Sequence, residues 1–139
     1  MHYYINIGSN LGNRLMNLSK AVSAIEKEFG WFELSHHIES EPWGYESKNK
    51  FLNIGMLFIS DKEPLEVLHI LQRIERAFSP ASHRNPDGSY RDRLIDIDIM
   101  AVDNIEMDTP ELKLPHPHLQ DRPFFLETFK ELLAQSPQS

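Results

Sequence analysis

Two aspartates alternate with isoleucines in the run IDIDI at positions 95–99. Successive side chains of a strand point to opposite faces, so the isoleucines would face a core while Asp96 and Asp98 share the other face, with Cα atoms about 7 Å apart. Magnesium favours sites with a few carboxylates, waters and the phosphate oxygens of a substrate. The run therefore predicts a magnesium site, although an isolated pair of this kind more often marks the solvated face of an amphipathic strand.

Cationic side chains cluster in the sequence around this strand. Arg91 and Arg93 come just before it. Further cationic residues fall in neighbouring loops: His83, Arg84, His116, His118 and Arg122. Such groups can pair with phosphates and offset the charge that develops on them in a transition state. Zinc binding by the two later histidines is a weaker alternative, because two ligands do not make a zinc site. The cluster favours a phosphate-handling site built without a Walker-type glycine-rich loop, which the sequence lacks.

Polar and aromatic residues elsewhere could bind a flat heterocycle or a nucleotide. Gln72 and Glu75 are three residues apart in a helical pattern, so they share a face that could contact a base or a ribose. Phe51 and Asn53 share one face of a strand, where the amide could bond a ring on which the phenylalanine stacks. Phe124 offers a second aromatic face. Each of these residues also has an ordinary explanation, as solvated helix surface or as part of the core.

The composition limits the possible function classes. A chain of 139 residues has a length typical of one domain, 1–139, with one core. It has no cysteine, which excludes disulfides, thiolate metal sites and cysteine nucleophiles. A net charge of −7 disfavours broad electrostatic binding to nucleic acid. The amino terminus has no signal-like leader, and no apolar run approaches the roughly 20 residues of a membrane span. We therefore expect a cytoplasmic protein with neither a nucleic-acid nor a membrane partner.

Apolar periodicity and turn residues divide the chain into strands and helices. Strands are predicted at 3–7, 32–38, 51–60 and 94–102, and helices at 13–29, 64–78 and 121–135. Asp61 is a candidate N-cap for the second helix. The order β-α-β-β-α-β is typical of the ferredoxin-like α+β fold, an antiparallel sheet covered by helices, here with extra C-terminal elements. Because this fold serves many unrelated activities, only the site can indicate the function.

Several short motifs follow one another in a familiar order. They are IGSNLGN near the amino terminus, SEPWG around position 42, FLN at 51–53, QRIE at 72–75, DRLIDIDIM at 92–100, and LPHP with DRPFF within 114–125. In this order the chain resembles the hydroxymethyldihydropterin pyrophosphokinases of the folate pathway over nearly its whole length. The most specific part is DR-x-IDIDI followed by PH and then R-x-F.

The resemblance implies an activity and a set of site residues. The enzyme would transfer pyrophosphate from ATP to the small molecule 6-hydroxymethyl-7,8-dihydropterin and release AMP, acting as a monomer. Asp96 and Asp98 would bind two Mg²⁺ ions, and Arg93 would lie near the reacting groups as a third catalytic residue. The ATP-binding residues would be Gln72, Glu75, Arg84, Arg91, Arg93, Ile99, His116 and Arg122. The pterin pocket would consist of Gly8, Ser40, Pro42, Trp43, Phe51, Asn53 and Phe124, with the two phenylalanines sandwiching the ring.

One segment departs from the family pattern. Relatives usually carry G-R-x-R just after the second helix, whereas this chain has Ser79-Pro80-Ala81-Ser82. Arg84 or Arg91 could take over the missing arginines through a shifted loop path. We predict turnover slower than is typical of the family. Two alternatives remain: a degenerate relative that binds pterin or nucleotide with weak or no catalysis, and a ferredoxin-like module that binds RNA or protein.

Overall fold

A computed structural model describes residues 1–41, 49–78 and 94–135 of the chain. Its elements, in order, are β1 (His2–Ser9), α1 (Arg14–Phe29), β2 (Phe32–Ser40), β3 (Phe51–Ile59), α2 (Pro64–Phe78), β4 (Asp96–Val102), β5 (Met107–Asp108), β6 (Lys113–Leu114) and α3 (Pro123–Gln135). The predicted order of elements is confirmed. Among the described residues no helix is both long enough and apolar enough to cross a membrane.

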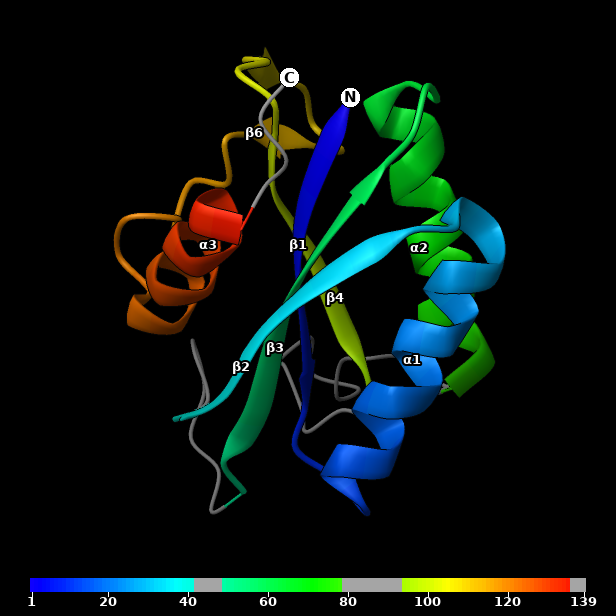
Figure 1. Ribbon diagram of the computed structural model, residues 1–139, viewed down its shortest axis with the longest axis vertical. Coiled ribbons are helices and arrows are strands. Elements are labelled where there is room, and N and C mark those ends of the chain that lie inside the picture. The colour runs from blue at the N-terminus through cyan, green and yellow to red at the C-terminus, as the bar shows by residue number, and fades with distance from the viewer. Residues whose placement is uncertain (42–48, 79–93, 136–139) are drawn as a thin grey trace.

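The main sheet has the strand order β2-β3-β1-β4, with every neighbouring pair antiparallel. Each helical crossover therefore joins two strands that have a third strand between them, which is the ferredoxin-like arrangement. In Figure 1, α1 and α2 cover one face of this sheet and α3 lies against the other. The α+β ferredoxin-like fold class is confirmed. The extra C-terminal elements are the small β5–β6 sheet and α3.

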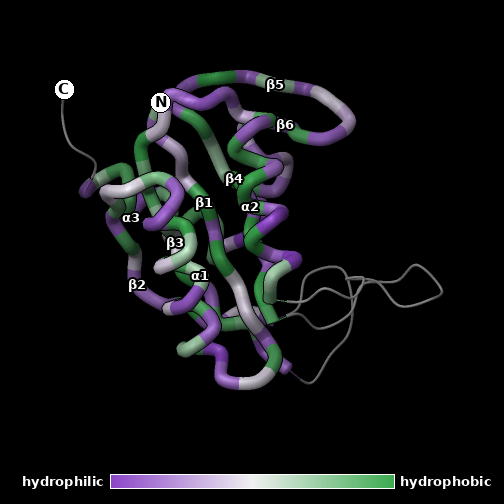
Figure 2. The backbone as a smooth tube through the Cα atoms, turned by 90° about the vertical axis from the view of Figure 1, so that its right-hand side faces the viewer, coloured by the Kyte–Doolittle hydropathy of each residue, from purple (hydrophilic) through white to green (hydrophobic). Residues whose placement is uncertain are grey.

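The two faces of the sheet bury two separate apolar clusters. Tyr3, Ile5 and Ile7 of β1 point toward α1 and α2, and the alternate residue Tyr4 points toward α3. The predicted isoleucines of the IDIDI run lie in the larger cluster: Ile95, Ile97 and Ile99. The tube of α2 alternates between hydrophobic and hydrophilic stretches, as expected for a helix with one buried face (Figure 2).

The ends of the helices refine the predicted boundaries. Asn13 caps α1, because its side chain accepts a hydrogen bond from the Met16 N–H at 3.1 Å. Leu15, whose spacing from Leu18 fits the apolar stripe of the helix, is 57% exposed in the first turn of α1. Asp61 does not cap α2, since the first helical hydrogen bond runs from the Val67 N–H to the Glu63 carbonyl. The cap position therefore belongs to Glu63.

Close packing of α3 fixes its position over the sheet. A Cβ atom added to Gly55 in β3 would lie 2.7 Å from Cβ of Thr128, a separation that real side chains do not reach. The absence of a side chain at Gly55 therefore lets α3 approach the sheet directly. This contact holds the middle of α3 on the same face of the sheet as Asp96 and Asp98.

Candidate active site

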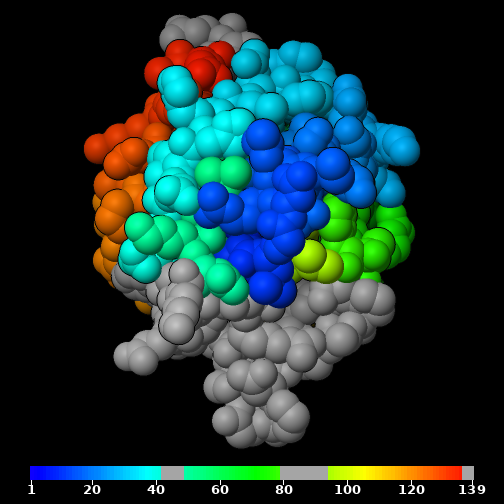
Figure 3. Space-filling model, turned by 90° about the horizontal axis from the view of Figure 1, so that it is seen from below, coloured from blue at the N-terminus to red at the C-terminus, as the bar shows by residue number. Residues whose placement is uncertain are grey.

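The predicted site residues gather at one end of the main sheet. Because the strands are antiparallel, the last residues of β1 and β2 lie beside the first residues of β3 and β4. Gly8 pairs with Asn53 on one side and with Asp96 on the other, and Ser40 pairs with Phe51. Figure 3 shows this end of the molecule, where the end of β1 meets the starts of β3 and β4.

Asp96 and Asp98 share the face of β4 that points away from the main core, as predicted. Both are partly exposed, and they lie opposite Gly8 and Asn6 of β1. Within the described ranges no group of three or more His, Asp or Glu side chains is arranged to hold a metal ion. Among the described residues, the expected donors for a cation are the carboxylates of Asp96 and Asp98. This set suits magnesium, which completes its octahedron with water and phosphate oxygens.

A cleft of about 580 Å³ opens beside this pair, between α2, β4 and the β6 segment. It brings together four residues expected to bind ATP and the two expected metal ligands: Gln72, Glu75, Ile99 and His116, with Asp96 and Asp98. Its wall also includes residues that the sequence reading missed: Leu68, Pro110, Glu111, Leu112, Lys113 and Pro117. The sequence signal for the 110–117 part of that wall is its position directly before and within the LPHP motif.

Glu75 connects α2 to β4, the strand that carries Asp96 and Asp98. Its carboxylate accepts a hydrogen bond from the Ile97 N–H at 2.7 Å. Among the strands of the described ranges, β4 is at the edge of the sheet, so this outward N–H has no neighbouring strand to bond. Gln72 lies one turn earlier on the same helix and is half-buried. Gln72 and Glu75 therefore share a face of α2, as expected, and Glu75 contacts β4.

His116 is held firmly next to Asp98. Its backbone N–H donates to the Met100 carbonyl at 2.8 Å, and its Nδ1 accepts from the His118 N–H at 3.0 Å. Burial, followed by the positive charges of Arg122 and His118, lowers the pKa of His116 to about 4. The ring is therefore neutral at physiological pH and carries its proton on Nε2, which lies 3.9 Å from Asp98 Oδ1.

Arg122 and two phenylalanines line the start of α3. The Arg122 guanidinium carbon lies 4.9 Å from the centre of the Phe125 ring, in a cation–π contact. The Phe125 ring also meets the edge of His116, with centroids 5.0 Å apart. Phe124 is half-buried and packs edge-on against Phe125 at 4.9 Å. The PH and R-x-F motifs thus meet in space, on the face of the sheet that carries the two aspartates.

The expected pterin residues of the sheet form a compact polar and aromatic cluster. Asn53 is buried and donates both amide hydrogens, to the Ile38 carbonyl at 3.0 Å and to Ser40 Oγ at 2.8 Å. A Cβ added to Gly8 would lie 3.0 Å from Asn53 Oδ1 and 3.2 Å from Phe51 Cδ1. Only glycine fits here without displacing these side chains. Gly8, Ser40, Phe51 and Asn53 are therefore brought together.

The sequence reading missed one member of this cluster. Asn6 in β1 donates from Nδ2 to Asn53 Oδ1 at 3.2 Å. The available signal was a lone amide in an otherwise apolar strand, two residues before Gly8 and so on the same face. Other expected residues lie outside the described ranges: Pro42, Trp43, the 79–82 segment, Arg84, Arg91 and Arg93.

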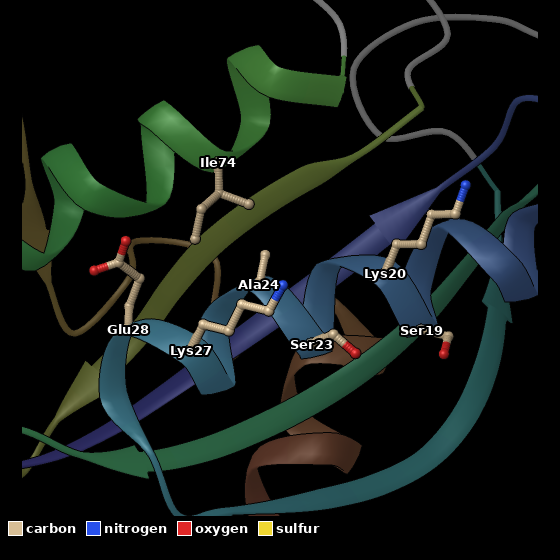
Figure 4. A pocket seen from close by; sticks show the side chains of 7 residues that line it. All are labelled: Ser19, Lys20, Ser23, Ala24, Lys27, Glu28 and Ile74. Atoms are coloured by element: carbon tan, nitrogen blue, oxygen red, sulfur yellow. The ribbon is translucent and has the colours of Figure 1, made fainter.

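A second hollow, of about 430 Å³, lies between α1 and α2 on the opposite face of the sheet. Figure 4 shows Lys20, Lys27 and two serines on α1, with Ile74 on α2 at its floor. All of its polar side chains are exposed, and Glu28 forms an ion pair with Arg73 at 2.6 Å. This hollow has the character of an open surface between two helices.

Comparison with known proteins identifies the family of this chain. A family model described as 7,8-dihydro-6-hydroxymethylpterin-pyrophosphokinase matches residues 4–134. A 2-amino-4-hydroxy-6-hydroxymethyldihydropteridine pyrophosphokinase of Porphyromonas gingivalis is 42% identical over 123 residues, which cover 87% of this chain and 83% of the relative. Proteins of the same name from Aquifex aeolicus and Bacillus subtilis are 31% and 30% identical, over 93% and 95% of this chain and 78% of each relative. The chain therefore belongs to the 7,8-dihydro-6-hydroxymethylpterin-pyrophosphokinase family.

Proposed function

We propose that this chain transfers the pyrophosphoryl group of ATP to 6-hydroxymethyl-7,8-dihydropterin, releasing AMP, in a magnesium-dependent step of folate biosynthesis. The proposal rests above all on one arrangement: Asp96 and Asp98 stand between the 580 Å³ cleft and the cluster of Phe51 and Asn53. A phosphate chain reaching from the cleft toward that cluster would pass the carboxylates. Membership of the family supports the same reaction.

Asp96 and Asp98 would hold two Mg²⁺ ions together with the phosphates. Both side chains are partly exposed on one face of β4, with room beside them for waters and phosphate oxygens. Bound there, magnesium would neutralise charge on the phosphate oxygens and favour their in-line alignment. The Glu75 carboxylate, by fixing the Ile97 N–H, keeps the backbone between the two aspartates in place.

Other residues would bind and orient the nucleotide. The neutral His116 offers an Nε2–H donor next to Asp98, suited to a phosphate oxygen. Gln72, Glu75 and the outer edge of β4 at Ile99 line the cleft, where a base and ribose would lie. Four arginines would pair with phosphates, Arg93 closest to the reacting groups: Arg84, Arg91, Arg93 and Arg122.

The pterin would bind at the other end of the site. Phe51 and Phe124 would supply stacking faces, and Asn53 a fixed polar contact. Gly8, Ser40, Pro42 and Trp43 would complete the pocket. The hydroxymethyl oxygen then bonds to the β-phosphorus, while the bond from that phosphorus to the α,β-bridging oxygen breaks. AMP leaves with the electron pair and the hydroxyl proton passes to solvent, so the protein acts mainly by positioning and charge stabilisation.

The degenerate alternative is less well supported. A protein that only binds ligands has little need for a carboxylate pair held by Glu75 and faced by His116. An RNA-binding role is disfavoured by the net charge of −7. We further propose that the enzyme is a single-domain monomer that works in the cytoplasm.

The metal assignment is tested by substituting each aspartate with asparagine. Asp96→Asn and Asp98→Asn should lower kcat by at least about 100-fold at saturating magnesium, because each removes a charged ligand of the metal. Asp103→Asn is a matched control: Asp103 follows the far end of the same strand and pairs with His2 at 3.1 Å. Near-normal rates in both aspartate variants, with unchanged dependence on magnesium, would show that the metal lies elsewhere.

A further inference from the structure

Asn6 is a buried amide in the middle of β1, on the face that carries the site. Only 3% of its surface is exposed. Its Nδ2 donates to Asn53 Oδ1 at 3.2 Å, and in the register of the sheet it lies between Gly55 of β3 and Asp98 of β4. Asn6 therefore separates the expected pterin cluster from the expected metal site.

Stability alone does not account for this residue. Within the part of the chain that the structure describes, Asn6 Oδ1 is buried and has no hydrogen-bond partner. A buried carbonyl oxygen without a donor costs free energy. An apolar side chain at the same place would avoid that cost, but it would leave the buried Asn53 Oδ1 without the donor that Asn6 supplies. The role of the Asn6 amide is therefore to donate to Asn53.

The bond from Asn6 supports the orientation of the Asn53 amide. Asn53 donates both Nδ2 hydrogens, to the Ile38 carbonyl and to Ser40 Oγ. Turning the amide over would set its oxygen against the Ile38 carbonyl and its NH₂ group against that of Asn6. The Ile38 carbonyl and the Asn6 Nδ2 donor together hold Asn53 Oδ1 toward the centre of the sheet, beside Gly8.

We propose that Asn6 is a positioning residue for the pterin, acting through Asn53. An amide oxygen accepts two hydrogen bonds, and Asn6 supplies one of them. The other lone pair of Asn53 Oδ1 accepts an N–H from the edge of the pterin, which carries an amino group and ring N–H groups. Asn6 thus helps to keep a hydrogen-bond acceptor, Asn53 Oδ1, at this contact. The pocket therefore selects a ring that presents an N–H donor to that oxygen. This inference rests on the proposed pterin site.

Four variants test the inference: Asn6→Ala, Asn6→Asp, Asn53→Ala and the double variant Asn6→Ala/Asn53→Ala. Asn6→Ala should raise KM for 6-hydroxymethyl-7,8-dihydropterin about tenfold, leaving KM for ATP within about twofold. Asn6→Asp should raise it further, because a carboxylate beside Asn53 Oδ1 repels that oxygen and opposes the orientation that the Ile38 carbonyl favours. In the Asn53→Ala background, Asn6→Ala should add nothing, since the residue acts only through Asn53.

Ser35→Ala is the matched control. Ser35 is a buried residue of β2 whose Oγ accepts from the Gly55 N–H at 2.7 Å, on the same sheet. It should lower the melting temperature and leave KM for the pterin unchanged. Asn6→Ala behaving like Ser35→Ala, or adding its full effect in the Asn53→Ala background, would overturn the inference. If Asn53→Ala itself left KM for the pterin unchanged, the proposed pterin site would be wrong instead.

Discussion

The Glu75 carboxylate on α2 accepts a hydrogen bond from the backbone N–H of Ile97, between the two aspartates of β4, at 2.7 Å. Ile97 itself points into the main core and Asp96 and Asp98 point the other way. One side chain thus satisfies an outward N–H of an edge strand and holds the segment that carries the expected metal ligands. Glu75 is therefore a positioning residue as well as part of the cleft wall.

Removing this bond should impair both stability and catalysis. Glu75→Ala leaves the Ile97 N–H without its acceptor and should cost about 1–3 kcal/mol of unfolding free energy. Glu75→Gln keeps an acceptor oxygen, so it should stay within about fivefold of the wild-type kcat, whereas Glu75→Ala should lose at least about tenfold. Urea unfolding and steady-state kinetics measure both effects.

Glu66→Ala, at an exposed carboxylate on the same helix, is the control. Equal losses in the two Glu75 variants would mean that its charge, and not its hydrogen bond, matters.

The neutral state of His116 predicts a pH dependence of stability. Its folded pKa of about 4 lies below the ordinary value of 6.5, so the unfolded chain binds the proton more readily. The stability contribution of the neutral ring is complete above about pH 6.5 and is lost as the pH falls through 4, by up to about 3 kcal/mol. Urea unfolding of metal-free protein should show wild type losing more stability over this range than His116→Gln. His69→Gln, at an exposed histidine, should retain the wild-type slope. If the unfolding free energies of wild type and His116→Gln changed in parallel with pH, the lowered pKa of His116 would be contradicted.

Replacing Gly8 or Gly55 with alanine should have different effects, although both glycines are on the same face of the sheet. In Gly8→Ala the new Cβ would press on Asn53 Oδ1 and Phe51 Cδ1, so KM for the pterin should rise at least about tenfold. In Gly55→Ala it would meet the backbone-fixed Cβ of Thr128, so the cost should be about 1–3 kcal/mol of stability with little change in KM. Thermal unfolding and pterin saturation curves separate the two effects. If the Gly8→Ala enzyme kept a normal KM for the pterin, Phe51 and Asn53 would not belong to the pterin pocket.

The 79–82 segment, which lies outside the described ranges, should limit turnover. Pro80 and Ser82 stand where the family resemblance leads us to expect arginine. Introducing arginine at both positions should raise kcat by up to about tenfold, since a guanidinium pairs well with phosphate oxygens. Pre-steady-state and steady-state rates of AMP release check this. The prediction fails if the unmodified chain already turns over at rates typical of the family and the arginines bring no gain.

Periodicity in the sequence predicted most of the fold and the carboxylate pair. Alternation of isoleucine and aspartate alone placed Asp96 and Asp98 on one face, because strand geometry leaves no other choice. The contacts of Glu75 with Ile97 and of Asn6 with Asn53 could not be predicted, since each needs the position of an element far away in the chain. Leu15 shows the same limit: its spacing fits the apolar stripe of α1, yet its side chain is exposed, because helical spacing cannot tell how far along the helix the packing extends.

The most direct test of the proposed reaction is to follow both products from ATP and 6-hydroxymethyl-7,8-dihydropterin with purified protein. The account predicts AMP and pterin diphosphate in equal amounts, formed only when pterin and magnesium are both present and lost in an Asp96→Ala variant. Formation of ADP, release of AMP without pterin, or pterin binding by calorimetry with no product at all would contradict it. The last result would leave a protein that binds the pterin without transferring the pyrophosphoryl group.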